Sequence, residues 1–226
     1  MWLTAIGAFV GAVLSLVISI IIENQRKPKL SFRIEDPPID VEYSNAPAKK
    51  ARFLRIQLWN NEMPKLFRWL SRESAMHCNA DIQILHLEDL APVFEKKVPA
   101  RWAGSDEPIS PQIHPKTGDL VPLFDISKYN AAFRRNCYPG TKETIDIAVR
   151  FDADEDCYVW TNDNYIKGWR NIELKLSKGR YYVILTVYSS GEKTRGYFKL
   201  ENSVSVKDFR LINVNDEERL RISKLQ

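Results

Sequence analysis

The stretch LSKGRYYVILTV, residues 176–187, joins a turn signal at Lys178-Gly179 to a run of aromatic and β-branched residues. Such a run favours an extended strand, which we expect over residues 180–188. Ser189, Ser190 and Gly191 then form a turn signal before a second strand expected over residues 195–201. The stretch therefore predicts an antiparallel hairpin.

Within the same stretch, Leu176, Gly179, Tyr181 and Val183 form the pattern Leu-x-x-Gly-x-Tyr-x-Val. This pattern resembles the corner of immunoglobulin-like sandwiches. The resemblance implies that Gly179 permits a tight turn and that the Tyr181 hydroxyl bonds back to the main chain. It indicates a fold and no particular function.

Further strands are expected on both sides of this hairpin, because Val, Ile, Tyr, Phe and Thr dominate the runs and Pro, Gly, Asn and Asp separate them. The expected strands cover residues 29–34, 53–59, 76–87, 92–98, 120–126, 143–151, 157–161, 170–176 and 204–214. Two proline-containing segments, 35–52 and 99–119, are expected to be irregular connections. Many short strands and few helical stretches predict an all-β fold, an immunoglobulin-like β-sandwich.

An apolar segment precedes this domain. Trp2 to Ile22 is a run of 21 residues without a charge, which is long enough to cross the hydrocarbon core as a helix. It lacks the basic leader, the shorter apolar core and the cleavage site of a secretory signal, so we expect an uncleaved transmembrane anchor. The chain then divides into an anchor (1–24), a juxtamembrane strand and Pro-rich connection (25–52), the sandwich (53–214) and a charged C-terminal tail (215–226).

The charges that flank this segment predict its orientation. Arg26, Lys27, Lys29 and Arg33 follow the segment, and no Lys or Arg precedes it. Basic residues near a membrane helix stay in the cytoplasm. We therefore expect a short N-terminus outside and a cytoplasmic β-domain, with which the odd number of cysteines agrees.

Small residues recur at every fourth position of the expected membrane helix, at Gly7, Gly11, Ser15 and Ser19. A helix face of this kind allows two backbones to approach closely inside the bilayer. The sequence predicts association with another membrane helix, from a second copy or from another protein, besides the contact with lipid.

The segment MPKLFRWLSR, residues 63–72, has the amphipathic pattern of a short helix. One face would hold Met63, Leu66, Phe67, Trp69 and Leu70, and the other Lys65, Arg68 and Arg72. Two interpretations stay open: a helix that covers one end of the sandwich core, which we favour, and a helix that lies in the lipid headgroup region.

Three carboxylates, Asp152, Asp154 and Asp156, alternate along one short stretch, a pattern that can surround a hard cation. Cys157 stands where an EF-hand requires glycine, so that motif is excluded, and a solvated acidic turn is the ordinary explanation. Cys78 is expected to pack as a small buried side chain. No zinc-binding spacing or phosphate-binding glycine loop occurs, so we expect no cofactor and no enzymatic activity.

The net charge of +4 is modest and both signs mix along the chain, so no nucleic-acid partner is expected. We expect a non-enzymatic binding or scaffold subunit of a membrane-associated assembly. A membrane-tethered receptor module for a small ligand or cation is the first alternative. A membrane-bound hydrolase that uses Cys78 or the Asp152 to Asp156 cluster is the second.

Overall fold

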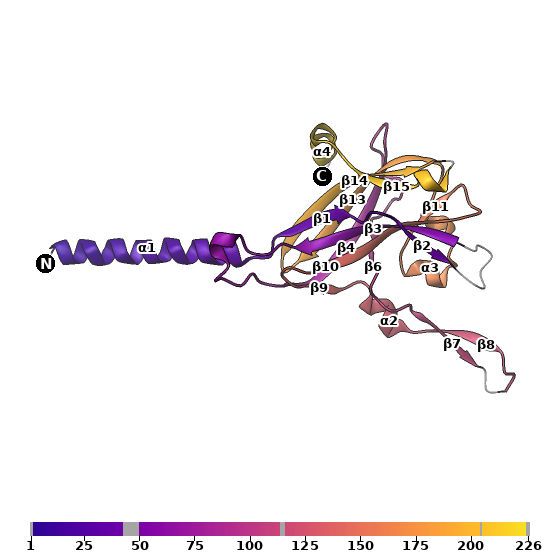
Figure 1. Cartoon of the computed structure of the whole chain (residues 1–226), viewed down its shortest axis with the longest axis horizontal. Helices are drawn as coiled ribbons and strands as arrows, with labels where there is room; N and C mark the ends of the chain where they lie inside the picture. Colours follow the sequence, from indigo (N-terminus) through magenta and orange to yellow (C-terminus); the bar gives the residue numbers. More distant parts are fainter. Residues whose placement is uncertain (1, 43–49, 114–115, 204, 225–226) are drawn as a thin grey trace.

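The computed structural model describes residues 2–42, 50–113, 116–203 and 205–224. Parts of five expected segments lie outside the described residues: residue 1 of the anchor, 43–49 of the Pro-rich connection, 114–115 of the second connection, residue 204 of the last strand and 225–226 of the tail. The chain begins with one long helix, which leads into a β-rich domain (Figure 1).

The N-terminal helix α1 spans Trp2–Arg26. Residues 6–26 of it are long and apolar enough to cross a membrane, and no part of that span is buried inside the structure. In Figure 1 the helix stands clear of the domain, with only its C-terminal end against the strands. Every side of the span is therefore available to lipid or to another helix.

Within the described residues, the first large sheet has seven strands in the order β1-β3-β10-β11-β12, with β2 also on β3 and β6 also on β10. Its strands are β1 (Leu30–Ile34), β2 (Ile39–Glu42), β3 (Lys50–Asn60), β6 (Arg101–Trp102), β10 (Lys142–Phe151), β11 (Cys157–Val159) and β12 (Lys175–Leu176). The pairs are antiparallel.

The second large sheet has six strands among the described residues, in the order β15-β14-β13-β4-β5, with β9 also on β4. Its strands are β4 (Ala75–His86), β5 (Val98–Pro99), β9 (Arg135–Cys137), β13 (Gly179–Ser189), β14 (Glu192–Asn202) and β15 (Arg210–Asn213). The predicted hairpin is its centre, since β13 and β14 pair from Gly179↔Asn202 to Ser189↔Glu192.

One hydrophobic cluster draws on both large sheets. Leu54 and Ile145 come from the first sheet, and Ile82, Val183 and Leu185 from the second. All five side chains are nearly or fully excluded from solvent. The two sheets therefore share a core, and burial of its apolar surface is the main source of their stability.

The expected corner forms at the start of β13. The Tyr181 hydroxyl donates to the carbonyl of Ser177 over 3.0 Å, which confirms the predicted bond to the main chain. Gly179 has a positive φ of 159°, which L side chains rarely adopt, although an added Cβ would itself make ordinary contact, 3.6 Å from the Tyr181 hydroxyl.

Several segments differ from the prediction. Residues 39–42 of the expected irregular connection form β2, and residues 92–98 form no continuous strand. The charged tail contains helix α4 (Asp216–Ser223), which begins with a capping box between Asn215 and Glu218. Ile222 of α4 is buried against the second sheet. The remaining short helices are η1 (Lys65–Phe67), α2 (Ile126–Ala131), α3 (Asp163–Ile166), η2 (Ile172–Leu174) and η3 (Val206–Asp208).

Candidate functional site

A two-stranded hairpin stands apart from both large sheets. It consists of β7 (Ile109–Ile113) and β8 (Leu120–Phe124), and Figure 1 shows it projecting from the domain at the lower right. We call residues 108–113 and 116–126 the arm. Its side chains include apolar groups with high exposed fractions: Ile113 70%, Val121 37%, Leu123 45%, Phe124 47% and Ile126 58%.

The arm cannot bury this apolar surface by itself. A hairpin of two strands is at best marginally stable in water without a third strand or a packed helix. Pro111 and Pro122 also face each other in the ladder, and neither has an amide hydrogen to donate. The arm therefore depends on its attachment to the domain and offers an apolar surface for another molecule.

The base of the arm is tied by α2. The Asp125 carboxylate accepts hydrogen bonds from the amides of Ser127 and Lys128, which caps the first turn of α2. The Asp125 amide donates to the carbonyl of Pro108 over 2.8 Å, which joins the two ends of the arm. Lys128 adds a side-chain bond to the Ser110 hydroxyl over 3.3 Å.

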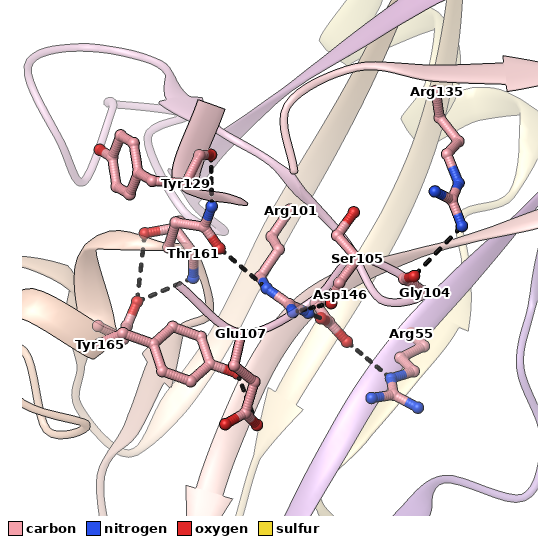
Figure 2. Close-up of polar contacts among 12 residues, drawn as sticks. Arg55, Arg101, Gly104, Ser105, Glu107, Tyr129, Arg135, Asp146, Thr161 and Tyr165 are labelled. Atoms are coloured by element: carbon pink, nitrogen blue, oxygen red, sulfur yellow. Dashed lines mark hydrogen bonds and ion pairs between the residues drawn. The ribbon is translucent and has the colours of Figure 1, made fainter. Parts of the chain in front are cut away.

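Beneath the base lies a buried ion-pair triad of Asp146, Arg55 and Arg101 (Figure 2). Asp146 on β10 is directly opposite Arg55 of β3 and Arg101 of β6, so the three side chains share one face of the sheet. The Asp146 carboxylate accepts from Arg55 Nε over 2.7 Å and from Arg101 Nη1 over 3.0 Å. Asp146 is 0% exposed and Arg101 is 4% exposed, so the pair is shielded from water.

Arg101 extends the triad toward the arm. Its Nε donates to Asn162 Oδ1 over 2.9 Å. The side-chain Nδ2 of Asn162 in turn donates to the main-chain carbonyl of Tyr129 in α2 over 2.8 Å. The guanidinium also lies over the ring of Tyr165, 5.5 Å from its centroid. One buried chain of bonds thus runs from the middle of the first sheet to α2, as the dashed lines of Figure 2 show.

The side chain of Tyr129 is also held in place by its hydroxyl and by its ring. Its hydroxyl donates to Asp163 over 2.5 Å, and its ring contacts Phe124 and Phe133 edge-on. Burial, and secondarily the Asp163 carboxylate, raise the pKa of Tyr129 to about 12. The phenol therefore stays protonated and acts as a structural donor over the ordinary pH range.

This arrangement positions the arm. The Asp146 carboxylate is neutralised by two cations, and no nucleophile lies among its bonded partners in the described structure. Buried, fully bonded polar groups of this kind fix one geometry of the segments they join. The candidate functional feature is therefore the arm as a binding surface.

The structure places the predicted amphipathic segment at the end of α1 and corrects its conformation. Only Lys65–Phe67 is helical, as the short 3-10 helix η1, so the predicted helix over 63–72 is wrong. Leu66 and Trp69 are 79% and 71% exposed and cover no core. Arg72 is buried, whereas the prediction placed it on the polar face. Its guanidinium donates to the main-chain carbonyls of Gln25 and Lys27 at the end of α1. These bonds bring the chain after η1 back to the end of α1.

The small-residue face of α1 contacts no other segment among the described residues. An added Cβ at Gly7 or Gly11 would find no atom within 4 Å. Ser15 and Ser19 lie on the same exposed helix. Association through this face stays a prediction.

The three carboxylates Asp152, Asp154 and Asp156 do not converge on one point. Asp154 pairs with Arg170 over 2.7 Å and Asp156 with Lys175 over 2.6 Å, while Asp152 is exposed. Among the described residues, no group of three or more His, Cys, Asp or Glu side chains could hold a metal ion. The acidic stretch forms the ordinary ion pairs of a β-turn region.

The three cysteines, Cys78, Cys137 and Cys157, are buried as free thiols. Burial raises the pKa of Cys78 and of Cys157, and raises that of Cys137 to about 11. Since a thiolate is the reactive form, none of the three is activated as a nucleophile. The packing expected of Cys78 agrees with this burial.

Sequence reasoning missed Arg101, Asp146, Tyr129 and Asn162. One signal was present: Asp146 interrupts the apolar run TIDIAV, where a charge needs a buried partner. The partners themselves are distant in sequence, 91 residues for Arg55 and 45 for Arg101. Comparisons of the chain with family models, with curated proteins and with solved structures found no match.

Proposed function

We propose that this protein is a single-pass, membrane-anchored binding subunit, a non-enzymatic scaffold or accessory component of a membrane-associated assembly. The β-domain, which we interpret as an immunoglobulin-like β-sandwich because its two large sheets share one core, would hold a protein partner near the bilayer. The observation that carries this proposal is the projecting arm with its exposed apolar side chains.

The arm has the properties of a binding element. Ile113 and Phe124 lie on one face of the hairpin and Leu123 on the other, and all three expose apolar surface that a partner could cover. The unpaired edges of a two-stranded hairpin can accept a further strand from a partner, although the two prolines limit this in the middle. A rigid base lowers the conformational entropy that a partner must remove on binding. A hydrophobic protein groove suits this surface.

The anchor supplies the second half of the proposal. α1 is long and apolar enough to cross a bilayer. Its last residue is the basic Arg26, and Lys27 and Lys29 come just after it. By the charge rule for short flanking segments, the β-domain would lie in the cytoplasm and the short N-terminus outside. Three free thiols agree with a reducing compartment.

The test is purification of the full-length protein from its native membrane in mild detergent, with the mass and composition of the particle measured. We expect other subunits at fixed stoichiometry. A monomer or homo-oligomer alone would contradict the accessory role and favour a self-contained receptor.

Variants then locate the contact. Ile113→Ser combined with Leu123→Ser should remove the partner and leave the domain folded, because both side chains are exposed. Ile172→Ser is the matched control, since Ile172 is 82% exposed and belongs to η2, outside the arm. Partner retention by the double variant would refute binding through the arm. The pair Gly7→Ile and Gly11→Ile tests the membrane helix in the same way.

A further inference from the structure

The end of the β-domain next to α1 is built around the last turn of that helix. Arg72 donates from Nη1 to the carbonyl of Gln25 over 3.1 Å and to that of Lys27 over 2.7 Å. The Glu73 amide donates to the carbonyl of Arg26 over 2.7 Å. The last carbonyls of a helix have no partner within the helix. Segment 61–74 therefore caps α1 from outside.

A buried asparagine locks this junction to the sheets. Asn60, at the end of β3, is 0% exposed. Its Oδ1 accepts from the Lys29 amide over 3.2 Å, and its Nδ2 donates to the carbonyls of Glu73 and Cys137 over 2.9 and 3.1 Å. One side chain thus joins the exit from α1, segment 61–74 and β9. The domain follows the helix without a flexible linker at this point.

The surface around the junction carries apolar, aromatic and basic side chains, and also the exposed carboxylates Glu62 and Glu73, of which Glu73 pairs with Arg26. Exposed fractions are 79% for Leu66, 71% for Trp69, 38% for Met76 and 53% for Tyr138. Met76 and Tyr138 belong to this end because Ala75 pairs with Cys137 and Pro139 bridges to Asn60. We call Leu66, Trp69, Met76 and Tyr138, with the exposed cations Lys65 and Arg68, the foot of the domain. Figure 1 shows η1, part of the foot, beside the C-terminal end of α1.

We propose that the foot rests on the headgroup region of the bilayer that α1 crosses and binds anionic phospholipid there. Trp and Tyr are the residues that gather at membrane interfaces, where an apolar ring and a polar edge are both satisfied. Lys65 and Arg68 would face lipid phosphates, to which basic side chains near the surface are attracted. The occupant follows from position, since α1 continues directly from this surface into the apolar span.

This inference rests on the proposed membrane anchoring, and it goes beyond it by fixing how the domain stands on the bilayer. A domain joined by a loose linker would leave the foot in water. Here the bonds of Arg72 and Asn60 hold the foot at the level where the helix leaves the apolar span.

A depth measurement on the full-length chain in lipid nanodiscs tests the proposal. Leu66→Cys takes an environment-sensitive fluorophore selectively, because the three native thiols are buried. Lys178→Cys is the matched control. Lys178 is exposed and lies just before the first residue of β13. The last residue of β13, Ser189, donates a hydrogen bond to the carbonyl of Met76 in the foot, so residue 178 is at the end of β13 away from the foot. We expect nitroxide-labelled lipid to quench the probe at 66 strongly and the probe at 178 little.

The lipid composition and a second variant test the charge. Quenching at 66 should be greater in discs with phosphatidylglycerol than in pure phosphatidylcholine, and Lys65→Gln with Arg68→Gln should remove that difference. Equal quenching at 66 and 178 in every lipid would overturn the proposal. Alkaline extraction of native membranes distinguishes the two levels: release of the chain refutes the anchor itself, whereas retention without quenching at 66 refutes only the foot.

Discussion

Replacement of Asp146 by alanine tests the buried triad most directly. The carboxylate is 0% exposed and neutralises Arg101, which is 4% exposed. Removing one partner of a buried ion pair leaves an uncompensated charge, which destabilises a protein by about 3–5 kcal/mol. For a domain of this size, that loss lowers the melting temperature by roughly 10 °C. Arg55 is less affected, because its side chain is 19% exposed and can hydrate.

The assay is thermal unfolding of the full-length protein in detergent, followed by near-ultraviolet circular dichroism. Glu201→Ala is the control, because Glu201 forms an ion pair of equal length with Arg210 at the surface, 3.0 Å. Exposed pairs contribute about 0–1 kcal/mol. If Asp146→Ala loses no more stability than Glu201→Ala, the triad does not hold the sheet as we reason.

The same variant also has a local readout. Because Arg101 connects Asp146 to Asn162 and then to the carbonyl of Tyr129, loss of the triad should loosen α2 and the base of the arm. Hydrogen exchange of the Asp125 amide, which is bonded to Pro108, should then accelerate more than global unfolding explains. If the exchange rate of the Asp125 amide changes only as much as the loss of global stability predicts, the triad does not stabilise the base of the arm.

Three further changes have defined outcomes. Ile222→Ala should cost about 2–4 kcal/mol, because this side chain of α4 is 1% exposed, whereas Leu220→Ala, at 62% exposed, should be nearly neutral in the same melt. Tyr181→Phe should cost about 1 kcal/mol through loss of the bond to Ser177, read as a shift of the urea midpoint. The free energy of unfolding should fall as pH rises from 9 toward 11. The reason is that the unfolded chain releases the Cys137 proton near the ordinary pKa of 9.0, whereas the folded chain keeps it up to a pKa of about 11. Cys137→Ala should make the free energy of unfolding depend less on pH over this range, and an unchanged slope would contradict the assignment to Cys137.

The sequence was sufficient to predict the long strands. Residues 53–59 and 143–151 fall within β3 and β10, because alternating apolar positions and β-branched residues favour an extended strand whatever the partner strand is. The bond of Tyr181 was also predictable, since it spans only four residues. Local patterns of this kind need no knowledge of distant contacts.

The segment at 63–72 shows where such patterns fail. Its amphipathic spacing predicted a helix, yet Arg72 is drawn to the carbonyls of Gln25 and Lys27, 47 and 45 residues earlier in the chain. Bonds to the end of α1 outweigh the weak helical preference of ten residues. The opposite error occurred at the C-terminus, where Asn215 and Glu218 had the spacing of a capping box and the charged composition led us to expect a tail.

With the foot on the bilayer as proposed, the triad and the foot would together set the place at which a partner meets this protein. Asn60 fixes β3 at the foot, and Arg55 fixes the same strand to the triad five positions away. At a rise of about 3.3 Å per residue, the triad stands at most about 17 Å from the foot along β3. Both attachments are buried, so this spacing does not depend on a linker. An arm carried on the triad would therefore present Ile113 and Leu123 at a constant height above the bilayer, which favours a partner that is itself held at the membrane over one that arrives from solution.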